Sequence, residues 1–196
     1  MQSNQELVFL SDGGEDIRGV QELLHPGAEH WLDWFHVTMR ITVLRQQTKS
    51  VAAENADLGR DTDRLLEKAK HYLWHGNVFQ ALEHMQLLED DLECVDNKTP
   101  AIKKVLAGLL EFRTYIENNS GLIPNYGERY RQGETISTAF VESKVNQVVS
   151  KRMSKKQQMR WTPRGAHLLL QARTKVLNGS LEETFRGWYP DFRRAA

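Results

Sequence analysis

The chain has 196 residues, of which 40% are hydrophobic and 27% are charged, an ordinary balance for a globular domain. No apolar run approaches the ~20 residues that a membrane span needs, and no secretory signal pattern opens the sequence, so a cytoplasmic protein is expected. Cys94 is the single cysteine, which excludes an internal disulfide and a cysteine-based zinc cluster. This length predicts one domain, or one domain with an insertion.

The net charge of zero conceals an uneven distribution of charge along the chain. From Ser143 onward, twelve Lys and Arg residues stand against three acids, a net charge of +9, which leaves −9 for residues 1–142. Such a separation suggests a basic surface that meets phosphates. Judged from charge alone, a solvated and charged helix face is about as well supported as a phosphate-binding surface.

The first 50 residues predict the order strand, helix, strand, helix. A short buried strand is expected over 6–11, a helix over 15–24, and a second, aromatic strand in EHWLDWFHV, residues 29–37. Helical spacing resumes from Thr38. This order is typical of an α/β layer with parallel or mixed strands.

The middle of the chain predicts helices only. Apolar residues recur at helical spacing over 61–93 and 100–118, and turn residues interrupt them at 75–77 and 97–100. No strand pattern occurs between residues 50 and 120. We therefore expect an all-helical insertion whose helices pair in antiparallel fashion, because the turns are short.

The last part of the chain predicts two further helices and a tail. Ser137 or Thr138 can cap a helix that runs to about Met153. Thr162 and Pro163 suit the N-cap and first position of a second helix, and Asn178-Gly179 suits its end. An aromatic and basic tail follows.

Three carboxylates and one histidine are candidates for chemistry. Asp12 ends the first predicted strand and precedes two glycines, which is how α/β sheets present ligands at their carboxyl edge. For Asp12 alone, a turn or a helix cap is the commoner use. Asp33 and His36 would lie on opposite faces of a strand but together on a helix, and they could orient one another or a neighbouring backbone without chemistry.

Glu142 is the third carboxylate, and the residues around it in the sequence make it a candidate for chemistry. It borders a valine stripe that we expect to be buried, consisting of Val141, Val145, Val148 and Val149. Most such glutamates are merely solvated, but a strand-end Asp precedes this one and a basic tract follows it. Carboxylates bind pairs of hard cations ~3.5–4 Å apart that act on phosphodiesters, although a third, shared carboxylate is normally needed. His71 and His75, four apart, lack an evident third ligand, so we expect ordinary surface or core histidines.

Three stretches of the chain together resemble a known family. They are FLSDGGEDI, HWLDWFHVTMRI and ISTAFVESKVNQVVSKRMSKKQQMRWTPRGAHLLLQAR, in that order. They resemble the second catalytic Asp strand, the Asp-x-x-His segment and the catalytic Glu block of bacterial insertion-sequence transposases of the DDE class. Within this class, the three stretches resemble those of a Mutator-like relative, which has a ribonuclease H-like catalytic domain and a helical insertion.

The resemblance implies a fold and a division of the chain. The fold is an α/β remnant of a ribonuclease H-like domain with a large all-helical insertion, mostly α by residue count. Residues 1–50 would be strands and helices of the core, and 51–130 the insertion. Residues 131–178 would hold the catalytic Glu helix and the basic terminal helices, and 179–196 the tail.

The resemblance also implies an activity and its residues. Asp12 and Glu142 would approach each other and hold Mg²⁺, with Asp33 and His36 as supporting catalytic residues, for cleavage and transfer of DNA strands. The partners would be duplex DNA at the transposon ends and target, with no membrane, and a homo-oligomer is left open. The residues facing the DNA backbone would be Lys151, Arg152, Lys155, Lys156, Arg160, Trp161 and Arg164.

One departure from the family limits this expectation. The family's first catalytic Asp lies on an earlier strand, and only eleven residues precede Asp12 here. We therefore expect a truncated transposase, inactive alone, in which Mg²⁺ binding is weak or absent. The alternatives are a helical DNA-binding or interaction protein derived from a transposase, and a helical adaptor built from residues 60–118.

Overall fold

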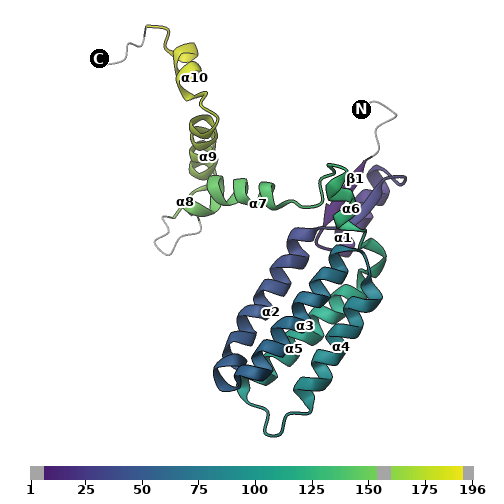
Figure 1. The fold of residues 1–196 in the computed structure, drawn as a ribbon. Coiled ribbons are helices and arrows are strands. Elements are labelled where there is room, and N and C mark those ends of the chain that lie inside the picture. Colours follow the sequence, from purple (N-terminus) through teal and green to yellow (C-terminus); the bar gives the residue numbers. More distant parts are fainter. Residues whose placement is uncertain (1–6, 154–159, 192–196) are drawn as a thin grey trace. The chain divides into compact units, whose positions relative to one another are not determined.

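The computed structural model describes residues 7–153 and 160–191, and most of them are helical (Figure 1). The chain divides into two compact units, residues 1–138 and 139–196, and each is described by itself. Within the described ranges, no helix combines the length and apolar character that crossing a membrane requires.

A small parallel sheet opens the first unit. Strand β1 (Val8–Ser11) pairs with β2 (Glu29–Leu32), and helix α1 (Glu15–Leu24) connects them. Ser11 lies opposite Leu32, so both strands end at the same edge. The predicted helix and the parallel pairing are confirmed. A ribonuclease H-like fold needs more strands than this pair supplies and stays a proposal.

The second strand is shorter than its sequence predicts. It ends at Leu32, and Asp33 caps helix α2 (Trp34–Glu54) by accepting a hydrogen bond from the backbone N–H of Phe35 at 3.0 Å. The expectation of a strand to residue 37, with helix only from Thr38, was therefore wrong. The aromatic residues favour a strand locally, but the N-cap and the apolar face that this segment shares with the rest of α2 outweigh that preference.

Four long helices form the main body of the first unit. Helix α2 is followed by α3 (Ala56–Trp74), α4 (Val78–Glu93) and α5 (Pro100–Asn118), and α2 packs against both α3 and α5 (Figure 1). Residues 51–120 contain no strand, as predicted. The largest fully buried side chains of this core are Leu32, Val37, Ile41, Leu66, Leu73, Met85, Leu88, Leu92, Leu109, Phe112 and Ile116.

Side-chain caps fix where the bundle helices begin. Asn55, Asn77 and Thr99 each accept a hydrogen bond from a backbone N–H in the first turn of the following helix. These bonds satisfy donors that have no partner inside a helix. The short connections around the caps turn each helix back along its predecessor, and this is the antiparallel arrangement that the sequence predicts.

A short segment after α5 closes the bundle beside the sheet. The 3₁₀ turn η1 (Ser120–Leu122) leads to helix α6 (Tyr126–Arg131). The fully buried Tyr126 ring lies 4.8 Å from that of Trp34, between ring centroids, and its hydroxyl donates to the Leu32 carbonyl at 2.7 Å. The end of β2 is therefore joined to a segment that follows the bundle.

The second unit begins with one helical run that changes its winding. Helix α7 (Ala139–Val145) continues as the π-helical turn η2 (Asn146–Ser150) and as α8 (Lys151–Met153). The predicted helix to about Met153 is thus confirmed, with a π segment that the sequence did not indicate. Such π-helical turns are rare and occur mostly as single turns inside α-helices.

Two more helices complete the described part of the second unit. Thr162 caps α9 (Pro163–Leu177), with Pro163 at the first helical position, and Gly179 follows its end at a φ of +69°. These boundaries agree with the prediction. The sequence left the tail undecided, and residues 181–188 of it form helix α10 (Leu181–Trp188).

The predicted burial of the valine stripe around Glu142 was wrong. Val141 is 43% exposed and Val145 is 45% exposed, and Val148 and Val149 are only half-buried. None of the described residues of the second unit is buried. The physical reason is that, among the described elements of this unit, α9 contacts the η2 turn that holds Val148 and Val149, and this limited contact leaves the stripe only partly covered.

Candidate functional site

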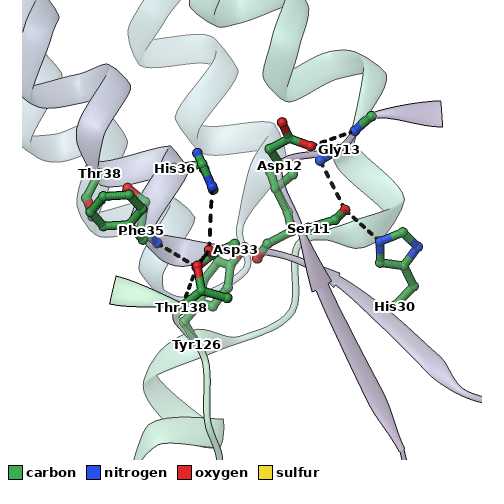
Figure 2. Close-up of polar contacts among 12 residues, drawn as sticks. Ser11, Asp12, Gly13, His30, Asp33, Phe35, His36, Thr38, Tyr126 and Thr138 are labelled. Atoms are coloured by element: carbon green, nitrogen blue, oxygen red, sulfur yellow. Dashed lines mark hydrogen bonds and ion pairs between the residues drawn. The ribbon is translucent and has the colours of Figure 1, made fainter. Parts of the chain in front are cut away.

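Two aspartates stand side by side where the parallel strands end (Figure 2). Ser11 pairs with Leu32, so the next residue of each strand, Asp12 and Asp33, leaves the sheet at its carboxyl edge. This is the edge at which α/β sheets present ligand-binding groups. The two carboxylates lie in different surroundings, because Asp12 is exposed and Asp33 is only 1% exposed.

The Asp12 carboxylate holds a tight turn and still faces solvent. Its Oδ1 accepts a hydrogen bond from the Gly14 backbone N–H at 3.1 Å. Gly13 adopts a φ of +89°, and a Cβ there would lie 2.4 Å from Oδ1 of Asn119. Only glycine suits this close approach to the end of α5. The turn role considered for Asp12 is therefore present, and it occupies one oxygen of the side chain.

The Asp33 carboxylate is filled by hydrogen bonds from two parts of the chain. Its Oδ1 accepts from the backbone N–H of Phe35 at 3.0 Å and from that of Thr138 at 3.1 Å. Its Oδ2 accepts from the Thr138 hydroxyl. A buried carboxylate needs such donors, because burial without them is costly. Asp33 therefore orients a neighbouring backbone, as the structural alternative for it allowed, and its contact with Thr138 is one that local sequence did not reveal.

His36 lies beside Asp33 on the first turn of α2. Its Nε2 is 3.8 Å from Oδ2 of Asp33, and the ring points toward that carboxylate (Figure 2). The helical alternative for this pair is thus the one that occurs. The imidazole is half-buried and lies at the same edge as Asp12, so the structure brings the Asp-x-x-His pair together there.

Sequence reasoning missed a serine and histidine that brace the edge. Ser11 Oγ lies 2.7 Å from Nε2 of His30 and accepts a hydrogen bond from the Gly13 N–H at 3.1 Å. Burial, and then the nearby Arg18 charge, lower the pKa of His30 and favour a neutral ring. The strand register was the available signal, because Ser11 pairs with Leu32 and His30 lies on the Leu32 face. Ser11 is only 7% exposed, which suits support rather than attack on a substrate.

Tyr115 of α5 is a second residue that sequence reasoning missed. Burial raises the pKa of Tyr115 to about 12, and the charges of Asp12 and Asp33 contribute to the rise. The Arg40 guanidinium opposes the rise and lies over the tyrosine ring, 4.2 Å from its centroid. Tyr115 of α5 therefore lies close enough to the two aspartates of the carboxyl edge to be affected by their charges.

Glu142 occupies a half-buried position on α7 in the second unit, whereas Asp12 belongs to the first. Their approach stays a prediction. Within residues 7–153 and 160–191, no group of three or more His, Cys, Asp or Glu side chains is arranged to hold a metal ion. His71, on α3, and His75, directly after its last residue, are exposed, with ring centroids 4.6 Å apart, as ordinary surface residues.

The predicted DNA-facing residues belong to the second unit. Four cations of that set are exposed, namely Lys151, Arg152, Arg160 and Arg164. Trp161 is half-buried between them in sequence. Lys155 and Lys156 lie outside the described residues.

Arg173 is a basic residue of this unit with a structural use. Its guanidinium donates from Nε to the Val148 carbonyl at 2.9 Å and from Nη2 to the Gln147 carbonyl at 2.7 Å. Both carbonyls belong to the π-helical turn η2, so Arg173 ties α9 to the irregular part of the preceding helical run. Basic residues of this unit are therefore not interchangeable.

The two units differ in charge and in the chemistry they offer. Residues 1–138 carry 14 Lys and Arg against 22 acids, a net −8, and residues 139–196 carry 12 against 4, a net +8. The first unit contributes the carboxylate edge, and the second contributes exposed cations and Glu142. No protein-family model, curated protein or solved structure matches the chain.

Proposed function

We propose that this chain is part of a DDE-class DNA transposase that cleaves and joins DNA strands. The observation that carries the proposal is the pair of parallel strands ending together in Asp12 and Asp33, in the contexts SDGG and LDWFH. The cationic second unit, which bears Glu142, supports it with a surface suited to a phosphate backbone.

Asp12 and Glu142 are the proposed metal ligands. Asp12 is exposed and has one oxygen not used by its turn, which fits a hard divalent cation. Glu142 follows Thr138 by four residues, a distance of about 6 Å along a helix. Because Asp33 holds Thr138 at the carboxyl edge, this short spacing favours Glu142 as the second ligand.

The shared carboxylate of a two-cation centre has no evident source at this edge. When bound, a cation pair activates the attacking oxygen and stabilises the leaving oxygen of a phosphodiester. Asp33 is the other acid at the strand ends, and hydrogen bonds from Phe35 and Thr138 already engage both of its oxygens. Asp33 and His36 are therefore proposed as support for the site, and Mg²⁺ binding by this chain is proposed to be weak.

An apolar helix face gives further support to a larger parent fold. Leu23 is 84% exposed and Leu24 is 68% exposed on α1, and Ile17 and Val20 are exposed as well. Gln21 is buried instead, and its amide donates to the carbonyls of His25 and Ala28. A crossover helix normally buries its apolar face. We propose that additional layers of an intact transposase cover this face.

The purified chain is expected neither to nick nor to join DNA in Mg²⁺ or Mn²⁺, because Asp12 and Glu142 do not complete a two-cation centre and the described residues arrange no third ligand with them. The measurement is conversion of supercoiled plasmid to nicked circles, with the Glu142→Gln variant as the background control. Metal-dependent nicking that Glu142→Gln abolishes would show that the centre is complete, contrary to this expectation.

The chain is expected to bind duplex DNA with little sequence preference and with a steep dependence on salt. The logarithm of the affinity falls with that of the salt concentration by about 0.9 for each phosphate contacted. Replacing Lys155, Lys156 and Arg160 with alanine should therefore reduce the slope by about 2 to 3. Fluorescence anisotropy with a labelled duplex between about 50 and 200 mM salt measures both quantities.

A matched variant tests whether position or total charge matters. Lys68, Lys103 and Lys104 are exposed lysines of the first unit, and their triple alanine variant removes the same charge. It should leave the salt slope close to that of the original chain. Equal slopes for the two triple variants would contradict a DNA surface on the second unit. DNA binding that persists while Mn²⁺ binds neither Asp12 nor Glu142 would instead favour the non-catalytic DNA-binding alternative.

A further inference from the structure

The buried carboxylate of Asp33 joins two segments that are 105 residues apart in the sequence. The Thr138 backbone N–H donates to Oδ1 at 3.1 Å, and the Thr138 hydroxyl donates to Oδ2. Next to them, the Trp34 N–H donates to the Ile136 carbonyl at 3.1 Å. Three hydrogen bonds therefore fasten residues 136–138 to Asp33 and Trp34. Figure 2 shows Thr138 beside the Asp33 carboxylate.

The hydrogen bonds between Asp33 and Thr138 are strong enough to hold Thr138 in one position relative to Asp33. Hydrogen bonds to an ionised acceptor are stronger than those between neutral groups, and shielding from water strengthens them further. The Asp33 side chain is only 1% exposed, and the Phe35 N–H holds it from the helix side. Thr138 is the last residue of the first unit, and α7 begins at the next residue.

We propose that Asp33 is a positioning residue that acts through Thr138. It anchors Thr138, the last residue of the first unit, so that only four residues of chain separate Glu142 from the anchored position. The anchoring is independent of any metal, whereas its value for Glu142 as a ligand rests on the proposed function. Asp33 of the Asp-x-x-His motif is then connected through Thr138 to α7, the helix that bears Glu142.

The anchor is tested by amide hydrogen exchange on the full chain, followed by NMR. Replacing Thr138 with valine removes the hydroxyl and keeps the shape, and exchange of the residue 138 amide should become at least about tenfold faster. Thr138→Ser should restore slow exchange. Thr42→Val is the matched control, because the Thr42 hydroxyl donates only within its own helix, to the Thr38 carbonyl at 2.8 Å.

A second measurement reads out positioning, which a merely structural contact would not change. Mn²⁺ added to the original chain should broaden the amide signals of Gly13 and Glu142 over the same concentration range. In Thr138→Val, broadening at Gly13 should persist, and broadening at Glu142 should need several-fold more Mn²⁺. Thr138→Ser should behave as the original chain does, and the thermal unfolding midpoint reports whether each variant is folded.

The outcomes distinguish the anchoring of Thr138 by Asp33 from the proposed role of Glu142 as a metal ligand. Unchanged exchange at residue 138 in Thr138→Val would overturn the anchor, whatever Mn²⁺ does. Changed exchange together with identical Mn²⁺ broadening in the original chain and in Thr138→Val would overturn the positioning of Glu142. A protected Thr138 amide with no Mn²⁺ effect at either Gly13 or Glu142 would support the anchor and overturn the proposed metal centre.

Discussion

Replacing Asp33 with alanine should lower the free energy of unfolding by about 3 kcal/mol, because it strands several buried donors at once. The N-cap of α2 alone accounts for about 1 kcal/mol. The Phe35 and Thr138 N–H groups and the Thr138 hydroxyl also lose their acceptor, in a place that water does not reach freely. Urea denaturation followed by circular dichroism measures the change as a shift of the midpoint.

The other two residues of the predicted site provide the comparison. His36 touches Asp33 at 3.8 Å and is half-buried, and Asp12 is exposed with one bond to the Gly14 N–H. Alanine at either position should cost less than about 1 kcal/mol. If His36→Ala or Asp12→Ala destabilised the chain as much as Asp33→Ala, the distinction between a structural Asp33 and ligand-facing neighbours would be lost.

Replacing Gly59 with alanine should destabilise the helical bundle by about 3 kcal/mol. A Cβ on Gly59 would lie 2.3 Å from Cβ, 2.4 Å from Cα and 2.8 Å from the backbone nitrogen of Ala52. Two of these atoms are backbone, so no side-chain rotation relieves the clash, and α2 and α3 must separate. The gain in helix propensity from glycine to alanine, about 1 kcal/mol, offsets only part of this cost.

Gly19→Ala is the control for the Gly59 variant. Gly19 also lies within a helix, α1, and no atom is within 4 Å of the position of its Cβ. The substitution should stabilise the chain by up to about 1 kcal/mol through helix propensity alone. Thermal unfolding of both variants shows whether the unfolding midpoint falls for Gly59→Ala and rises for Gly19→Ala. A stabilising Gly59→Ala would mean that α2 and α3 do not approach as closely as described.

Local signals in the sequence predicted most of the secondary structure and failed where tertiary contacts decide. The bundle helices follow their apolar spacing, and the predicted cap at Thr162 marks where α9 begins. The start of α2 was missed because Trp34 and Phe35 favour a strand, whereas Asp33 caps a helix there. The valine stripe on α7 was misjudged because periodicity identifies an apolar face but not whether a second layer covers it.

The residues of the candidate site also fall into those that local sequence indicates and those that only long-range contacts bring to the site. Asp12 follows from a strand-end pattern, and the Asp33 and His36 pair from a motif with helical spacing. The role of Thr138 had no local signal, because its contact with Asp33 spans 105 residues and exists only when the bundle has closed. Tyr115 likewise reaches the edge only through the packing of α5 beside α2. Contacts of this range depend on the fold and not on neighbouring residues.

The path of the bundle has a consequence for the order in which the chain folds. Helix α2 begins beside β2, and η1, which follows α5, contacts the same strand, so four helices return the chain to its start (Figure 1). Contacts between consecutive helices are local and form fast, whereas closing a 105-residue loop is entropically slow. Once the helices have paired, only the stretch 119–138 remains to be closed, which lowers the entropy cost by about 1.5 kcal/mol. We therefore expect the contacts of the carboxyl edge with residues 119–138 to form after the four helices have paired.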